Sequence, residues 1–348
     1  MSKIRALVIE DSLTVRKRLI EVLSADPDIE VVGEGADGKQ AIELCQRLRP
    51  DVITLDMILP VMSGFAATEY IMAYCPTPIL VVSSSTNRGE LFRTYEALAA
   101  GAVDVLDKPT GEEPDERWER QLIQTVKLVS RIKVITHPRG RMNQRRSSTP
   151  PGPSASAIRC VAIGASTGGP AAVLEVLRSL PSDFPIPIAL VIHIGRVFAQ
   201  SLAEWLDGES PIRVRQAKDG ELWPLLGTSS VLIAPSDRHM TISNGRIWLT
   251  NEAERHSCRP SVDVLFDSVA RNFGAAGAGC LLTGMGKDGA EGLLHIRQSG
   301  GPTIAQDEAS SVIYGMPREA AEIGAASNIL PLNKIARALL DLAASATK

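Results

Sequence analysis

Short apolar runs alternate with amphipathic stretches over the first third of the chain. The amphipathic stretches, such as residues 15–23 and 41–48, carry apolar residues at helical spacing. The apolar runs that are typical of strands are residues 6–9, 30–33, 52–55, 79–82 and 103–106. Five β/α units within about 125 residues predict a doubly wound α/β domain with a parallel sheet.

The same alternation returns after residue 157. Four apolar runs, CVAIGA, IALVIH, SVLIAP and GCLLTG, begin at Cys160, Ile188, Ser230 and Gly279 and predict further strands. Glycine-rich turns and helical patterns follow the first and the last of these runs. A second doubly wound α/β domain with a mainly parallel sheet is therefore expected.

The segment 131–157 breaks this pattern. It carries six Lys or Arg residues and no acidic residue, and it continues into a Pro/Ser/Gly stretch. Such a composition cannot bury enough apolar surface to offset the entropy of ordering, so a flexible tether is expected. Because the basic run lacks aromatic residues, it does not favour nucleic-acid binding. The predicted organisation is a domain over 1–125, a helix end and linker over 126–157, and a second domain over 158–348.

The composition favours a soluble protein without membrane or nucleic-acid partners. The 348 residues suffice for two domains, and the net charge of -3 gives no general attraction to nucleic acid or anionic lipid. The five cysteines are scattered without CxxC spacing, which indicates reduced thiols rather than a disulfide or zinc framework. No signal peptide is recognised, and the apolar runs are too short to insert into a bilayer. A cytoplasmic location is expected.

Polar and charged residues follow the strands predicted in the first domain: Glu10, Asp11, Asp56, Ser83 and Lys108. Because the carboxyl ends of parallel strands meet at one edge of the sheet, these side chains are expected to converge. Three carboxylates in one place need a cation, and Mg²⁺ suits oxygen ligands. Asp56 is then a candidate nucleophile toward a phosphoryl group, whose charge Mg²⁺ and Lys108 would neutralise. The Ser83 hydroxyl could bond the transferred phosphoryl.

This set resembles the receiver domain of response regulators, over about residues 1–125. The resemblance implies a flavodoxin-like fold in which Asp56 takes phosphate from a histidine kinase. It also implies that Glu10, Asp11 and Asp56 hold Mg²⁺, and that Ser83 and Lys108 report the phosphorylated state. The run LDMILPVMSGF resembles the phosphorylation loop, but Ile58 stands where the family is usually polar or acidic. Metal binding survives if that position uses its backbone carbonyl, whereas the lifetime of the phosphate could differ.

The segment GASTGGP follows the strand predicted at 160–165 and admits two interpretations. A glycine-rich loop could cradle a dinucleotide phosphate, but GxGxxG spacing is absent. Alternatively, Ser166 is a nucleophile exposed on a strand-to-helix turn. Backbone N–H groups at the start of that helix, beginning with Thr167, would then suit a developing oxyanion.

A serine nucleophile needs a base. The chain has five histidines, at positions 137, 193, 239, 256 and 295. His193 ends a strand next to that of Ser166, which suits a general base, and Asp288 in GMGKDG is the best orienting carboxylate. On these grounds alone, the three could equally be structural polar residues.

Four segments, GASTGGP, TGMGKDGAEG, RPSVDVLFDSVA and AQDEASSVIYGMPR, resemble the catalytic domain of the protein-glutamate methylesterases of bacterial chemotaxis, the CheB family. The resemblance spans nearly all of 158–348. It implies that Ser166 is the nucleophile, His193 the base and Asp288 its orienter. Thr167 and Met285 would lie near the oxyanion site.

The resemblance also implies an activity. The enzyme would hydrolyse glutamate 5-O-methyl esters on the cytoplasmic helices of chemoreceptors, releasing methanol, and would deamidate receptor glutamines as a glutaminase. The esterase would need no cofactor.

One departure keeps other functions open. After His193 the family usually continues Met-Pro, whereas this chain reads HIGRVF. A serine hydrolase for another ester or amide therefore remains an alternative, as does a non-enzymatic, phospho-dependent binding switch. His239 and His256 fall in family-like segments and are expected to be structural or to face the substrate.

Overall fold

The computed structural model describes residues 3–84, 88–108, 116–132 and 157–345. The chain divides into two compact units, Met1–Ser147 and Ser148–Lys348. The linker expected over 126–157 falls mostly on residues 133–156, which lie outside the described part, so it stays a prediction. None of the described helices is long and apolar enough to cross a bilayer.

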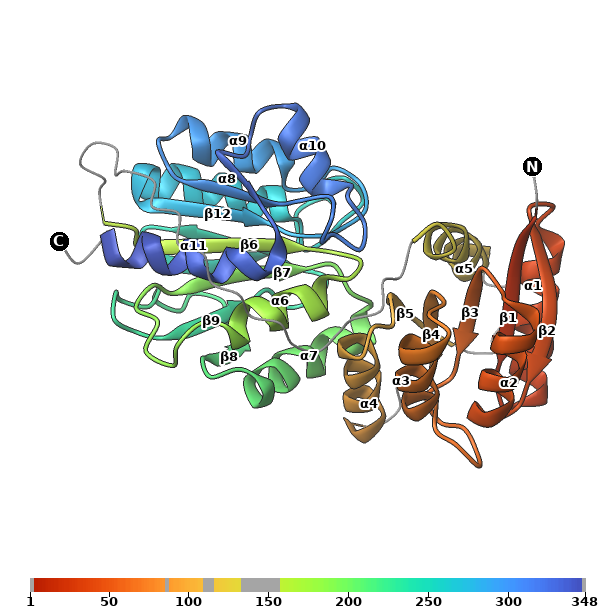
Figure 1. The fold of residues 1–348 in the computed structure, drawn as a ribbon. Coiled ribbons are helices and arrows are strands. Elements are labelled where there is room, and N and C mark those ends of the chain that lie inside the picture. The colour runs from red at the N-terminus through yellow and green to blue at the C-terminus, as the bar shows by residue number, and fades with distance from the viewer. Residues whose placement is uncertain (1–2, 85–87, 109–115, 133–156, 346–348) are drawn as a thin grey trace. The chain divides into compact units, whose positions relative to one another are not determined.

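The first unit is a parallel sheet with helices on both sides (Figure 1). The elements in chain order are β1 (Ile4–Ile9), α1 (Leu13–Ala25), β2 (Ile29–Gly35), α2 (Gly38–Leu48), β3 (Val52–Leu55), α3 (Gly64–Tyr74), β4 (Ile79–Ser83), α4 (Arg88–Ala99), β5 (Asp104–Asp107) and α5 (Glu116–Val129). The sheet order is β2-β1-β3-β4-β5, and every neighbouring pair is parallel. This is the flavodoxin-like order that the family resemblance implied.

The second unit contains a larger sheet of the same kind. Its elements are β6 (Cys160–Ala165), α6 (Gly169–Arg178), β7 (Ile188–Ile192), α7 (Arg196–Glu209), β8 (Arg213–Gln216), β9 (Ser230–Ile233), β10 (His239–Ser243), β11 (Arg246–Thr250), α8 (Val262–Phe273), β12 (Gly277–Leu281), α9 (Ala290–Gln298), β13 (Thr303–Gln306), α10 (Met316–Glu322), β14 (Asn328–Leu330) and α11 (Leu332–Ser345). Seven parallel strands run in the order β14-β13-β12-β6-β7-β9-β8. The predicted α/β class is confirmed for both units.

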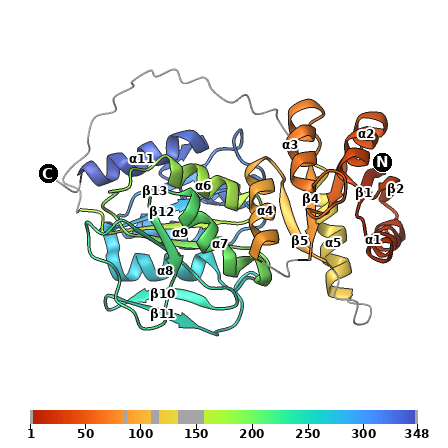
Figure 2. The same ribbon diagram turned by 90° about the horizontal axis from the view of Figure 1, so that it is seen from below.

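Helices cover both faces of the second sheet. The helices α6, α7 and α11 pack on one face, and α8, α9 and α10 pack on the other (Figures 1 and 2). The antiparallel hairpin of β10 and β11 packs against α8. Strands β6 and β7 are fully buried, which explains why they read as continuous apolar runs rather than as alternating patterns.

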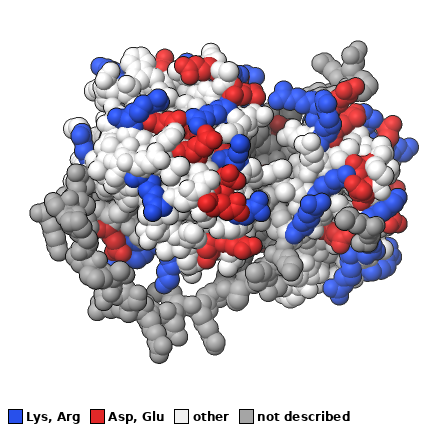
Figure 3. All heavy atoms as spheres, turned by 90° about the horizontal axis from the view of Figure 1, so that it is seen from above, with Lys and Arg blue, Asp and Glu red and all other residues white. Residues whose placement is uncertain are grey.

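Acidic and basic side chains are interspersed on the face of the second unit that carries α9 and α10 (Figure 3). Within this unit, the Arg255 guanidinium contacts the carboxylates of Asp267 and Glu291 at 2.6 and 2.9 Å. On this face, the mixed charge forms no extended basic surface of the kind that nucleic acid requires.

Candidate functional site

The polar residues of the first unit meet at the carboxyl edge of its sheet. Glu10 and Asp11 follow β1, Asp56 follows β3, and Lys108 follows β5. The Lys108 ammonium lies 2.8 Å from a carboxylate oxygen of Glu10 and 2.8 Å from one of Asp56. Carboxylate oxygens of the three acidic residues lie within 4.8 Å of one another. The structure thus brings together the residues from which the sequence predicted a metal and phosphoryl site.

The electrostatics of this site favour a further cation. Burial raises the pKa of Glu10 to about 7 and also raises the pKa of Asp56, although the Lys108 ammonium opposes both shifts. One ammonium therefore does not fully compensate two buried carboxyl groups. Asp11 is exposed and offers a third oxygen ligand. This donor set fits Mg²⁺, which prefers a few carboxylates and retains water.

Ser83 completes the site from the end of β4. Its Oγ is buried and has no hydrogen-bond partner among the described residues. A buried hydroxyl without a partner is unfavourable, and a phosphoryl oxygen would satisfy it.

The loop after Asp56 returns close to the Asp56 backbone at the start of α3. A Cβ on Gly64, the first residue of α3, would lie 2.0 Å from the Asp56 carbonyl oxygen, so only glycine fits there. The Ile58 side chain departs from the family pattern and is 39% exposed. It therefore offers an apolar surface where a polar side chain is usual.

In the second unit, the predicted triad stands at the ends of three neighbouring strands. Ser166 follows β6, His193 follows β7, and Asp288 lies in the loop after β12. Strand β6 lies between β12 and β7, and the chain order of the strands reverses there. Such a switch point at the carboxyl edge is where open α/β sheets bind their ligands.

The backbone of Ser166 is fixed by its neighbours. Its N–H donates to the Thr283 carbonyl at 3.0 Å. A Cβ on Gly284 would lie 2.7 Å from the Ser166 Cβ and 2.3 Å from the Met316 sulfur. Glycine at 284 therefore allows the loop after β12 to pass directly beside the serine.

Asp288 is bound to the start of α8. Its carboxylate accepts hydrogen bonds from Ser261 Oγ at 2.7 Å and from the N–H groups of Val262 and Asp263 at 2.7 and 3.1 Å. A helix N-terminus stabilises an anion through these N–H groups and through its dipole. The fourth contact of the carboxylate is His193 Nε2 at 2.9 Å.

The contact between His193 and Asp288 shifts both pKa values. Burial raises the pKa of Asp288, but the hydrogen bonds from His193, Ser261 and Val262 outweigh it, and the pKa is lowered overall. Burial lowers the pKa of His193, but its contacts with Asp288 and Cys258 outweigh this and raise it to about 9. The pair is therefore an aspartate held as an anion beside a strongly basic imidazole.

Ser166 and His193 are neighbours without a direct hydrogen bond in the described part of the chain. The His193 N–H donates to the Ala165 carbonyl at 3.0 Å, and Ala165 pairs with Ile192 in the sheet. Ser166 and His193 therefore directly follow the last paired residues of β6 and β7. In ligand-free enzymes catalytic hydrogen bonds are often long, and they tighten when substrate binds.

Two residues expected at the oxyanion site flank the serine. Thr167 is buried, and its carbonyl accepts from Thr283 Oγ1 at 3.0 Å. Met285 follows Gly284, and its side chain is 57% exposed. The Met285 N–H donates to no acceptor among the described residues, which leaves it available to an oxyanion.

His239 and His256 are both engaged in structural hydrogen bonds. His239 is fully buried; its Nδ1 accepts from the Ser261 N–H at 3.2 Å, and its Nε2 lies 3.1 Å from the Ala253 carbonyl. His256 Nε2 contacts the Asp263 carboxylate at 3.0 Å. Both rings thus support the start of α8, which in turn holds Asp288. His137 lies outside the described residues.

Sequence reasoning missed two residues of the site, Ser261 and Cys258. Ser261 caps α8 by accepting from the Val264 N–H and also binds Asp288. A serine directly before an apolar helical run is a recognisable cap signal. Cys258 Sγ lies 3.7 Å from His193 Nδ1. Nothing in the local sequence indicates this contact.

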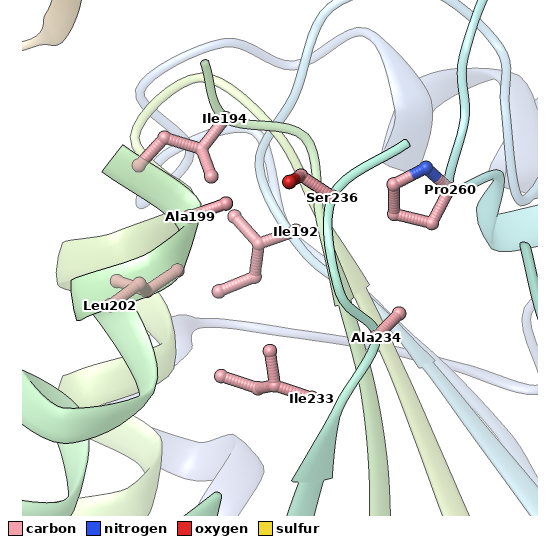
Figure 4. Close-up of a pocket in the computed structure, with 8 residues that line it drawn as sticks. All are labelled: Ile192, Ile194, Ala199, Leu202, Ile233, Ala234, Ser236 and Pro260. Carbon is pink, nitrogen blue, oxygen red and sulfur yellow. The ribbon is translucent and has the colours of Figure 1, made fainter. Parts of the chain in front are cut away.

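The departure HIGRVF has a structural role. A small cavity of about 10 Å³ lies beside the end of β7, lined by Ile192, Ile194, Ala199, Leu202, Ile233, Ala234, Ser236 and Pro260 (Figure 4). It has room for about one water molecule, so it is no substrate pocket. Ile194 faces α7 in this cavity, so the residue after His193 contributes to packing between the end of β7 and α7.

Both parts of the chain match known protein families. The CheB methylesterase family matches residues 161–339, and the response regulator receiver domain matches residues 6–115. "Protein-glutamate methylesterase/protein-glutamine glutaminase 2" of Anaeromyxobacter dehalogenans is 44% identical over 97% of each chain. A relative in Nitrosospira multiformis, "Protein-glutamate methylesterase/protein-glutamine glutaminase", is 44% identical over 98% of this chain and 97% of its own.

The solved CheB methylesterase catalytic domain of Thermotoga maritima is 37% identical, with a TM-score of 0.50; the match covers 53% of this chain and 98% of that one. The family assignment therefore rests on both domains and on almost the full length. This chain belongs to the CheB methylesterase family, with a response regulator receiver domain ahead of the catalytic domain.

Proposed function

We propose that this protein hydrolyses glutamate 5-O-methyl esters on the cytoplasmic helices of chemoreceptors, using Ser166, under the control of phosphorylation at Asp56. The observation that carries the proposal is the contact of 2.9 Å between His193, at the end of β7, and Asp288, in the loop after β12; these two strands flank β6, which Ser166 follows. Relatives of nearly the same length carry the names of both the methylesterase and the glutaminase, which supports receptor glutamine deamidation as a second reaction. Methanol release from methylated receptors is the test.

The chemistry follows from the positions of the three side chains. Ser166 attacks the ester carbonyl while His193 accepts its proton, and Asp288 stabilises the resulting imidazolium. In this proposal the N–H groups of Thr167 and Met285 would hold the tetrahedral oxyanion. His193 then protonates the departing methoxide, leaving a glutamyl ester on Ser166. Water, deprotonated by the same histidine, releases the free glutamate.

The receiver supplies the control. A histidine kinase would donate the phosphoryl group to Asp56, and Mg²⁺ held by Glu10, Asp11 and Asp56 would neutralise its charge during transfer. Lys108 already contacts the Asp56 carboxylate at 2.8 Å, so transfer would replace that contact with one to the phosphoryl oxygens. The Ser83 hydroxyl, which has no partner among the described residues, would then bond the phosphoryl group and report its presence.

Asp56→Asn is expected to abolish phosphorylation. With acetyl phosphate and Mg²⁺, the wild-type protein should gain one acid-stable and base-labile phosphoryl group, because an acyl phosphate forms only on a carboxylate. Intact-mass measurement before and after alkaline treatment detects it. Asp11→Asn is a matched control that leaves the acceptor and should slow phosphorylation by weakening Mg²⁺ binding. Phosphate on a serine or histidine would overturn the assignment.

Esterase activity is expected to rise with pH, to be about half-maximal near pH 9 and to level off only above it. His193 must be neutral to accept the serine proton, and its raised pKa of about 9 keeps it charged at lower pH. The activity is therefore low when His193 is protonated and increases as pH passes through that pKa. The measurement is kcat/KM for a small ester across the neutral and alkaline range. A rate that falls with rising pH would contradict the role of His193 as base.

A further inference from the structure

One cysteine stands apart from the other four. Cys258 is partly exposed, whereas Cys45, Cys75, Cys160 and Cys280 are buried. Its Sγ lies 3.7 Å from Nδ1 of His193. Asp288 contacts the other ring nitrogen, Nε2. The site thus contains a soft sulfur ligand and an imidazole nitrogen side by side, which the proposed hydrolysis does not require.

The position of Cys258 is set by a tight turn. Arg255 and Cys258 exchange two backbone hydrogen bonds, of 3.2 and 3.0 Å, across His256 and Ser257. These two central residues have φ values of 52° and 59°. Contacts of Arg255 with Asp267 and of His256 with Asp263 anchor the turn to α8, so the sulfur is presented from a fixed support.

The separation of the two ligand atoms matches that in a zinc site. A tetrahedral zinc ion holds sulfur at about 2.3 Å and nitrogen at about 2.0–2.1 Å, so two such ligands lie about 3.6 Å apart. The observed separation is 3.7 Å. In addition, Asp288 contacts the other ring nitrogen of His193 at 2.9 Å. A carboxylate on the far nitrogen of a metal-binding histidine is the usual outer partner, which orients the ring and increases its basicity.

We propose that Cys258 and His193 bind Zn²⁺, and that the bound ion inhibits the esterase. The ion would take Cys258 Sγ as a thiolate and His193 Nδ1, with water in its remaining positions. Binding would release the thiol proton and, where His193 is protonated, its Nδ1 proton to solvent, and would occupy the nitrogen that faces away from Asp288. His193 could then no longer accept the proton of Ser166.

A second group of possible metal ligands in the domain, which has a histidine and two acidic residues but no cysteine, is a poorer zinc site. His256, Asp263 and Glu291 also lie within 4.8 Å of one another. The Arg255 guanidinium already stands among them, 3.6 Å from Asp263 and 2.9 Å from Glu291. A cation that is part of the protein would repel a divalent ion there. Mg²⁺ is not expected at Cys258, because it prefers oxygen ligands.

The test uses the full chain, with Co²⁺ as a spectroscopic substitute for zinc and Zn²⁺ itself as the inhibitor. Co²⁺ bound to a thiolate gives a near-ultraviolet charge-transfer band, which oxygen ligands of the receiver do not produce. We expect this band in the wild-type protein and its loss in Cys258→Ser. We also expect Zn²⁺ to inhibit hydrolysis of a small ester and the Cys258→Ser variant to need at least about tenfold more zinc. Mg²⁺ at the same concentration should not inhibit.

Glu291→Gln is the matched control, because it removes a ligand from the neighbouring group and leaves Cys258 in place. Its zinc inhibition should equal that of the wild type. Absence of the thiolate band from the wild-type protein, or equal inhibition of wild type and Cys258→Ser, would overturn the proposal. The inhibition rests on the proposed role of His193, whereas the band does not. A cysteine-dependent band without inhibition would thus uphold the metal site and refute His193 as the base.

Discussion

Ser166→Ala is expected to remove methanol release almost completely. The nucleophile works as a unit with its base, and in a well-studied serine protease the loss of either costs a factor of about 10⁶ in rate. The fold should be unaffected, because the Ser166 side chain makes no hydrogen bond within the described part of the chain and alanine keeps its Cβ. The measurement is methanol released from methylated receptors per unit time, with thermal unfolding as the check on stability.

Two further readouts separate loss of the nucleophile from general damage. A serine-reactive phosphonate should label the wild-type protein at one site and should not label Ser166→Ala. Phosphorylation of Asp56 should be the same in both proteins. If Ser166→Ala kept most of the wild-type rate, the serine mechanism would be refuted.

Asp288→Asn is expected to be the second most severe change. The equivalent substitution in a serine protease lowers kcat by about 10⁴, because the base loses its orientation and tautomer. Here the carboxylate also accepts bonds from Ser261, Val262 and Asp263, all at the start of α8. An amide would direct N–H groups toward these donors, so we expect a stability loss of about 1–3 kcal/mol for a buried donor left without an acceptor.

Ser261→Ala is the matched control for Asp288→Asn. It removes one hydrogen bond to the Asp288 carboxylate and the cap of α8, but it leaves the negative charge beside His193. It should lower stability by about 1 kcal/mol and reduce activity far less than Asp288→Asn does. The pH dependence distinguishes the two, because only the loss of the carboxylate should lower the pKa of His193 substantially. Near-normal activity of Asp288→Asn would show that another group orients the base.

Much of the fold could be predicted because its central strands are buried on both faces. The run at 160–165 corresponds to β6, and the run at 52–55 corresponds to β3. In the second unit, the edge strands β8 and β14, their neighbour β13 and the hairpin outside the sheet were not predicted. β8 is short and carries the exposed Arg213, and the hairpin of β10 and β11 alternates polar and apolar residues against α8. In these elements tertiary packing decides the structure, and the local pattern is weak.

The candidate site also contains residues that could be predicted from the sequence and residues that could not. Ser166, His193 and Asp56 were predictable because each follows a recognisable strand, and the ends of parallel strands converge. The contact of Cys258 with His193 could not be predicted, because it depends on a turn with two non-glycine residues at positive φ. Such backbone is rare and has no clear sequence signal. The role of Ser261 was accessible in part, as a helix cap, but its contact with Asp288 is a tertiary feature.

The most direct test of the central claim is methanol release from radiolabelled methylated chemoreceptors by the full chain, with and without a phosphodonor. We expect the wild-type protein to release methanol and the phosphodonor to increase the rate. A shift of about 1.4 kcal/mol between inactive and active states already gives a tenfold change. Asp56→Asn should keep the basal rate and lose the increase. The absence of methanol release by the phosphorylated wild-type protein would contradict the proposed activity, and an equal response of Asp56→Asn would contradict control through Asp56.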